Sequence, residues 1–170
     1  TKDREPDAQI TVFSNPRLLA PVRAFVASLA ERTGFEELLC CQISLAVDEA
    51  VANIINHGYR RRHDGRIWIY AWVLEAAAPG LCIVLDDLGN QVDPQSIKGR
   101  DLDDIRPGGL GVHIIREIMD RCAYERRSPG GMRLTLVKYL PQHGGLSGGP
   151  APSSGDQSKP VADPHARTQP

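Results

Sequence analysis

The 170-residue sequence lacks an excess of charge of either sign and lacks a long apolar run. Lys and Arg number 20 and Asp and Glu number 21, a formal charge of −1. This balance argues against a general polyanion binder, and we expect no direct contact with nucleic acid. No apolar stretch approaches the ~20 residues that cross a bilayer, and the start, TKDREPDAQI, has no hydrophobic signal-peptide core. We therefore expect a cytoplasmic protein without membrane contact.

The sequence also lacks a cysteine framework. Its four cysteines, Cys40, Cys41, Cys82 and Cys122, match neither a paired zinc motif nor a dense disulfide pattern. Each lies in an apolar run, which predicts buried free thiols in a reducing compartment.

What the sequence does contain is one domain of ordinary composition. Apolar residues make up 41% and charged residues 24%, as in globular proteins. We place the folded domain at residues 8–141. Residues 142–170 are rich in Gly, Pro and Ser and almost free of large apolar residues. Such a segment buries too little surface to offset its ordering entropy, so we predict a disordered tail.

Hydrophobic periodicity alternates between strands and helices along the domain. It predicts strands near 9–13, 66–74, 81–86, 123–126 and 132–139, and helices near 16–34, 36–57 and 111–121. Asn15 is a helix cap with Pro16 at the first helical position, and Gly34 and Gly58 are stop signals. This order predicts an α/β (α+β) two-layer sandwich, with a mixed, mostly antiparallel sheet packed against three helices.

The second predicted helix carries a polar face. Glu49, Asn53 and His57 are spaced four residues apart and therefore line one side of the helix. The core stripe is expected on the other side, at Ile43, Ala46, Val47, Ala50 and Ile54. The Asn oxygen suits Mg²⁺, and a Glu carboxylate accepts a proton from a hydroxyl or water. A solvated polar face is the alternative interpretation.

A second candidate element follows a strand, in the run Leu85–Asn90. Asp87 stands two residues before Gly89. The carboxylate suits an exocyclic amine, and the glycine leaves room for a flat ring. A simple turn explains the same residues, and the neighbouring Asp86 competes for the role.

The third element is a glycine-rich loop that opens the last predicted helix, with Arg106 before it. Gly109 and Gly111 expose backbone N–H groups at a helix start, an arrangement that binds anions. The stretch is neither a dinucleotide fingerprint, for want of the third glycine, nor a Walker loop, for want of Gly-Lys-Ser/Thr.

Together and in this order the three elements resemble the Bergerat-type ATP-binding fold of gyrase, histidine kinases, heat-shock chaperones and mismatch-repair ATPases. Glu49 and Asn53 look like its N box, and the two glycine elements look like its glycine boxes. The closer resemblance is to the small anti-sigma-factor serine/threonine kinases, through DEAVANIINHGY, DDLGNQVDP, GGLGVHIIREIMD and GGMRLTLVKYL. It covers residues 8–141.

The resemblance implies ATP and Mg²⁺ as cofactors and a role for each residue. Glu49 is the implied general base toward a Ser or Thr hydroxyl, and Asn53 is the implied Mg²⁺ ligand. The other implied ATP-binding residues are Asp87 and Gly89 at the adenine, and Arg106, Gly109, Leu110 and Gly111 at the phosphates. For Arg106 a solvated position in the lid 93–108 is equally open, and the role of His57 is also open. The lid is expected to be mobile until nucleotide binds.

The implied function is a kinase that phosphorylates a STAS-type anti-anti-sigma partner and sequesters a sigma factor to regulate transcription, as a homodimer. The alternative is an ATP-binding partner-switching module without kinase activity. We discount a histidine kinase, since only about 35 residues precede the helix with Glu49. We discount a gyrase-like ATPase, since the chain has no length for a transducer domain.

Overall fold

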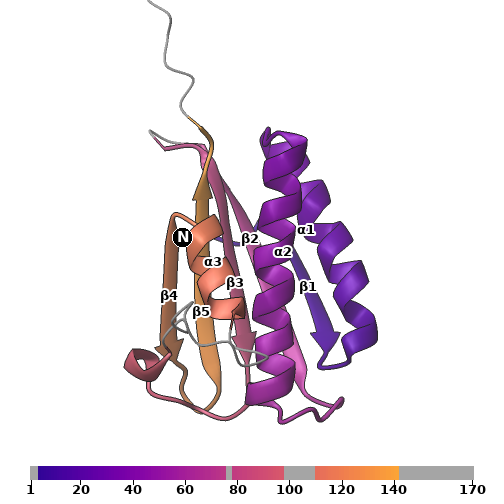
Figure 1. The fold of residues 1–170 in the computed structure, drawn as a ribbon, viewed down its shortest axis with the longest axis vertical. Coiled ribbons are helices and arrows are strands. Elements are labelled where there is room, and N and C mark those ends of the chain that lie inside the picture. Colours follow the sequence, from indigo (N-terminus) through magenta and orange to yellow (C-terminus); the bar gives the residue numbers. More distant parts are fainter. Residues whose placement is uncertain (1–3, 76–77, 98–109, 142–170) are drawn as a thin grey trace, which may run out of the picture.

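The computed structural model describes residues 4–75, 78–97 and 110–141. A five-stranded sheet carries three α-helices on one face (Figure 1). The strands are β1 (Ala8–Phe13), β2 (Arg66–Leu74), β3 (Gly80–Asp87), β4 (Arg121–Arg126) and β5 (Met132–Tyr139). The helices are α1 (Leu19–Thr33), α2 (Glu37–Asn53) and α3 (Gly111–Ile118). Short turns of other helix types lie at Pro16–Leu18, Ile54–Gly58 and Pro94–Ser96. The predicted two-layer architecture is confirmed.

The sheet has the strand order β1-β2-β3-β5-β4, and all four pairings are antiparallel. The parallel component expected from the sequence does not occur among the described strands. The reason is the return of the chain after α3. β4 forms the edge of the sheet, and the chain then turns back so that β5 lies between β3 and β4 and pairs with both.

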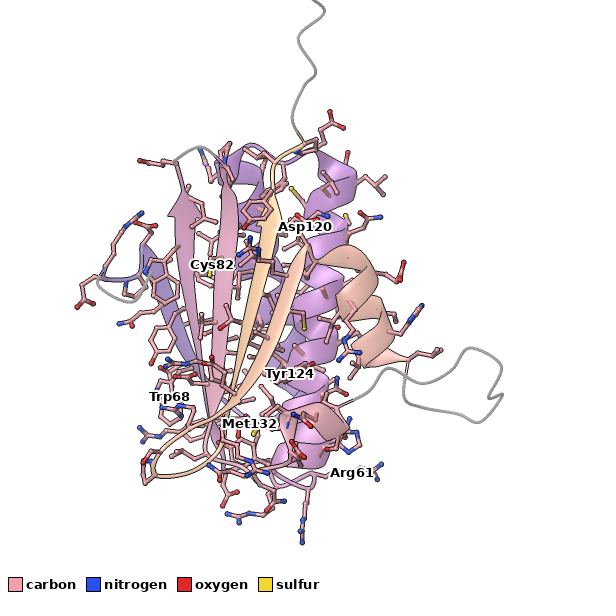
Figure 2. All side chains as sticks on the ribbon, turned by 90° about the vertical axis from the view of Figure 1, so that its left-hand side faces the viewer. Arg61, Trp68, Cys82, Asp120, Tyr124 and Met132 are labelled. Carbon is pink, nitrogen blue, oxygen red and sulfur yellow. The ribbon has the colours of Figure 1, made fainter. Side chains whose placement is uncertain are left out.

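Strand alternation separates two apolar layers. Residues of β2, β3 and β5 that face the helices form the main core with α1 and α2, including Ile69, Ile83 and Leu136, which are fully or almost fully buried. The opposite residues form a smaller cluster on the outer face, with Trp72 and Cys82. Figure 2 looks along the layers, with Cys82 on the outer side of the sheet and Tyr124 on the helix side.

The predicted start signals act on the 3₁₀ turn Pro16–Leu18, and α1 itself begins three residues later than expected, at Leu19. The Asn15 side chain accepts a hydrogen bond from the Arg17 N–H, and Pro16 opens the first turn. Gly34 ends α1 at φ +101°, a conformation that favours glycine.

Helix α2 buries the expected stripe and ends differently from the prediction. Ile43, Ala46, Val47 and Ala50 are buried as predicted. Ile54 is only partly buried and lines a cavity instead. From there the helix widens into a π turn over Ile54–Gly58, in which the Tyr59 N–H donates to the Ile54 carbonyl at 2.8 Å. The predicted α-helix to residue 57 therefore ends four residues early.

Helix α3 is also shorter than predicted. It ends at Ile118, and Met119 is already extended, at φ −92° and ψ 137°. Asp120 donates its N–H to the Val137 carbonyl, and its carboxylate accepts from the Tyr139 N–H. Residue 121, expected in the helix, thus opens β4.

Two other expectations from the sequence are corrected. Cys40 and Cys82 are buried, but Cys41 is exposed and Cys122 only partly buried. Cys41 follows a buried residue on a helix, so the helical period turns it outward. The segment Glu37–Gly58 is long and apolar enough to span a membrane by length and composition, contrary to the expectation. It packs in the domain as the core helix, and such helices pass the same test.

Candidate nucleotide site

A cavity of about 400 Å³ opens between the end of α2, the start of α3 and the sheet. It is lined by Ala50, Asn53, Ile54, His57, Gly58, Asp87, Asn90, Val92, Ser96, Ile97, Val112, Tyr124, Met132 and Leu134. Most of these side chains are apolar, and a few polar groups converge on the space. This volume and lining are typical of a small-molecule site.

Asp87 provides the buried carboxylate of this cavity, with an exposed fraction of 3%. Its Oδ1 accepts hydrogen bonds from the Gly89 N–H at 2.6 Å and the Met132 N–H at 3.4 Å. Burial raises the pKa of Asp87, against the opposing effects of these two N–H groups and of Arg127. Because two backbone donors occupy Oδ1, Oδ2 is the oxygen left for an amine-bearing ligand.

The neighbouring Asp86 lies on the outer face of the sheet and does not line the cavity. Both of its oxygens accept from Arg133, each at 2.7 Å, and the Arg127 Nε lies 3.3 Å from Oδ2. The ambiguity between the two carboxylates is therefore resolved by strand alternation, since Asp87 follows Leu85 on the helix side.

Gly89 packs directly on the end of the π turn. A Cβ at Gly89 would lie 2.6–2.8 Å from backbone atoms of Gly58. The next residue, Asn90, donates its N–H to the Gly58 carbonyl at 2.9 Å. A side chain at residue 89 would force the loop away from α2, so glycine is required for this close approach.

Tyr59 ties the same loop to the sheet. Its hydroxyl donates to the Arg66 carbonyl at 2.5 Å and accepts from the Leu88 N–H at 2.9 Å. Its ring fills the space beside Gly65, where a Cβ would lie 2.3 Å from a ring carbon. Burial raises the pKa of Tyr59, so the hydroxyl remains protonated and able to donate.

At the other end of the cavity, Gly111 lies against the polar face of α2. A Cβ at Gly111 would be 2.6 Å from Oε2 of Glu49 and 3.2 Å from Nδ2 of Asn53. The Asn53 Nδ2 is buried and has no hydrogen-bond partner among the described residues. Glu49 is partly buried, with its carboxylate directed to the start of α3.

These features fit a nucleotide with a metal ion. The cavity has a buried carboxylate at the Asp87 end. Gly89 lets the loop after β3 pack on Gly58, Gly111 has no side chain beside Glu49 and Asn53, and the donor Nδ2 of Asn53 is unpaired among the described residues. An amide oxygen suits Mg²⁺, and exposed N–H groups at a helix start suit phosphate.

The structure thus brings together most of the predicted site residues. Glu49 and Asn53 lie at the Gly111 end, and Asp87 and Gly89 lie at the other. Leu110 is 50% exposed beside α3. Arg106 and Gly109, most of the lid and the tail 142–170 lie outside the described residues. His57 lines the cavity.

Sequence reasoning missed the apolar walls and Tyr59. Val92 and Ile97 come from the loop after β3, and Tyr124, Met132 and Leu134 from β4 and β5. The inward positions of these last strands were readable from their alternation. Nothing in the sequence indicated that the loop carries a wall of the cavity.

Residues 12–138 match the sequence profile of the family described as the histidine kinase-like ATPase domain. A solved histidine kinase domain, from the blue-light activated histidine kinase of Erythrobacter litoralis EL346, aligns with a TM-score of 0.46 and 17% identity. The alignment covers 72% of this chain and 59% of that one.

Curated relatives include serine-protein kinase RsbW from Staphylococcus aureus strains bovine RF122 / ET3-1 and MRSA252. Each is 26% identical over 148 residues, which cover 82% of this chain and 90% of the relative. The resemblance inferred from the three motifs is confirmed at the level of the family, whose profile spans most of the domain. The chain belongs to the histidine kinase-like ATPase domain family.

Proposed function

We propose that this protein is an ATP-dependent serine/threonine protein kinase and anti-sigma factor. Its substrate is a STAS-type anti-anti-sigma protein, and its other partner is a sigma factor that it sequesters in a partner-switching pathway. The observation that carries the proposal is the position of the Glu49 carboxylate: it is directed to Gly111 at the start of α3, beside Asn53, which lines the cavity. The names of the relatives, serine-protein kinases, support the same activity.

In this proposal, one set of residues binds the adenine and another binds the phosphates and Mg²⁺. Asp87 would accept a hydrogen bond from the adenine amine through its Oδ2, and Gly89 lets the loop pack on Gly58 while its N–H binds Asp87 Oδ1. Leu110 and Gly111 present N–H groups to the phosphates, together with Gly109 and Arg106. Asn53 would hold Mg²⁺ through its amide oxygen. ATP supplies the transferable phosphoryl group, and Mg²⁺ neutralises the charge on it.

Glu49 is the general base of the proposed reaction. Its carboxylate accepts the proton of the Ser or Thr hydroxyl and thereby makes the oxygen nucleophilic. The carboxylate extends toward Gly111 at the start of α3, where a Cβ would lie 2.6 Å from its Oε2. Phosphoryl transfer depends mainly on positioning and charge neutralisation, so this small set of groups is sufficient.

The decisive experiment is incubation with γ-labelled ATP and the cognate STAS protein, with wild type, Glu49→Ala and Glu125→Ala. Glu125 is an exposed carboxylate on β4, away from the cavity. We expect phosphoserine or phosphothreonine with wild type and Glu125→Ala, and a loss of about 100-fold or more with Glu49→Ala. Wild-type transfer by Glu49→Ala would refute the assignment of the base.

The second candidate is a nucleotide-dependent partner-switching module without kinase activity. It is favoured by the same cavity, which binds nucleotide whether or not transfer follows. It predicts an ATP-dependent complex with the STAS protein and no phosphorylated product in the same assay. We further propose that the protein acts in the cytoplasm and that it forms a homodimer. Measuring its molecular mass in solution with and without ATP tests the homodimer.

A further inference from the structure

Helix α2 carries an exposed apolar stripe, the α2 stripe, formed by Leu38, Cys41 and Leu45. Leu38 is 70% exposed and Leu45 is 43% exposed, and Cys41 is exposed between them. At about 100° per residue, Leu38, Leu45 and Glu49 fall within about 40° of one another around the helix axis. The stripe therefore runs along the same side of α2 as the proposed catalytic base.

The α2 stripe lies on the open side of the central helix. Figure 1 shows α2 between α1 and α3 on one face of the sheet. On the α1 side, Arg23 pairs with Asp48 at 2.9 Å. On the α3 side, the Glu49 carboxylate is directed to Gly111, where a Cβ would lie 2.6 Å from its Oε2. The nucleotide cavity starts beyond this point, at Ala50 and Asn53, so the stripe and the cavity reach Glu49 from different directions.

We propose that the α2 stripe is the docking surface for the protein substrate of the kinase. This inference rests on the proposed function. A hydroxyl that transfers its proton to Glu49 must come from a side not taken by the nucleotide, and the stripe leads to Glu49 from such a side. Leu38 lies eleven residues from Glu49, about 16 Å along the helix. A partner seated on both leucines thus extends over the base.

The charges beside the stripe indicate the chemistry of the partner. Glu36 and Glu37 are exposed at the Leu38 end, and Glu49 lies at the other end. Asp48 is already paired with Arg23 and adds no free charge. The complementary partner surface is therefore apolar in its centre, carries Lys or Arg at its edge, and presents its Ser or Thr beside that edge.

The first test is steady-state phosphorylation of the cognate STAS protein by the double variant Leu38→Ser/Leu45→Ser. We expect the KM for the protein substrate to rise at least 10-fold, with the Kd for ATP unchanged. Phe13→Ser is the matched control, because Phe13 is 51% exposed and lies on β1, away from α2. An unchanged KM in the double variant would overturn the proposal.

Cross-linking separates failure of docking from failure of the proposed kinase activity. A benzophenone maleimide attached to Cys41 should capture the STAS protein upon irradiation. The control is Thr11→Cys in a Cys41→Ser background, since Thr11 is exposed on β1. Capture of the STAS protein without any phosphorylated product would refute the proposed kinase activity but support the α2 stripe as the docking surface. Capture of a second copy of this chain, with no STAS adduct, would assign the stripe to self-association and overturn the inference.

Discussion

Asp86 and Asp87 are neighbours in sequence whose carboxylates lie on opposite faces of β3. Asp86 is held by Arg133 and Arg127 on the outer face, and Asp87 opens into the cavity with Gly89 as its backbone donor. The two residues have similar burial, with exposed fractions of 1% and 3%. Their surroundings differ: Asp86 is paired with two arginines, whereas Asp87 lines the cavity, where we propose that it binds the ligand.

Substitution by Asn should separate these two roles. Asp87→Asn places an amide N–H₂ where the adenine amine needs an acceptor, so we expect ATP affinity to fall about 10- to 100-fold. Asp86→Asn removes the charge between two guanidinium groups. It should lower the free energy of unfolding by about 1–3 kcal/mol and leave ATP affinity unchanged. Titration calorimetry and urea denaturation measure the two effects, and equal losses of affinity would contradict the assignment.

The raised pKa of Asp87 predicts a pH dependence of stability. The folded state binds the Asp87 proton more tightly than the unfolded state, in which the ordinary pKa is 3.8. The stability contributed by this proton is complete below pH 3.8 and is lost as the pH rises through the folded pKa. Without nucleotide, wild type should therefore lose stability relative to Asp87→Asn as the pH rises above 3.8. Urea denaturation of both proteins at several pH values measures the difference in their free energies of unfolding. A difference that stays constant with pH would contradict the prediction.

Gly111→Ala should impair transfer without damaging the fold. The added methyl group would lie 2.6 Å from Oε2 of Glu49, so the carboxylate must move. A displacement of this size can reduce phosphoryl transfer by about 100-fold. At the first position of α3, Ala costs no helix stability and can add up to about 1 kcal/mol. Gly130→Ala is the control, because a Cβ there meets nothing within 4 Å, and it should retain wild-type rates.

Tyr59→Phe should weaken nucleotide binding through the loop that follows β3. The ring still packs beside Gly65, but the Leu88 N–H and the Arg66 carbonyl lose their shared partner. We expect a decrease of about 1–3 kcal/mol in the free energy of unfolding. ATP affinity, measured under conditions where the protein is fully folded, should fall several-fold. Tyr139→Phe, on the outer face, should leave ATP affinity at the wild-type value.

The sequence predicted the elements of this fold well because each has a local cause. Alternation marked the strands, and Asn15 and Gly34 marked the ends of the first helical segment. Alternation also carries the assignment of Asp87 to the helix side, since Leu81, Ile83 and Leu85 precede it at every second position.

The features that sequence reasoning missed are set by tertiary contacts. The insertion of β5 between β3 and β4 depends on which edge the chain reaches after α3. The early end of α3 depends on hydrogen bonds from Asp120 to Val137 and from Tyr139 to Asp120, which span seventeen and nineteen residues. The role of Tyr59 needs partners from β2 and from the loop after β3. No local pattern encodes such contacts.

The π turn at Ile54–Gly58 fixes the number of residues in this segment more strictly than it fixes which residues they are. It accommodates one residue more than an α turn and brings the Gly58 carbonyl to the Asn90 N–H. Deleting one residue here would rotate everything that follows by about 100° and remove Gly58 from the loop. The side chain of Asn56, in contrast, is exposed. Substitutions should accumulate at Asn56, whereas insertions and deletions should be absent from the segment.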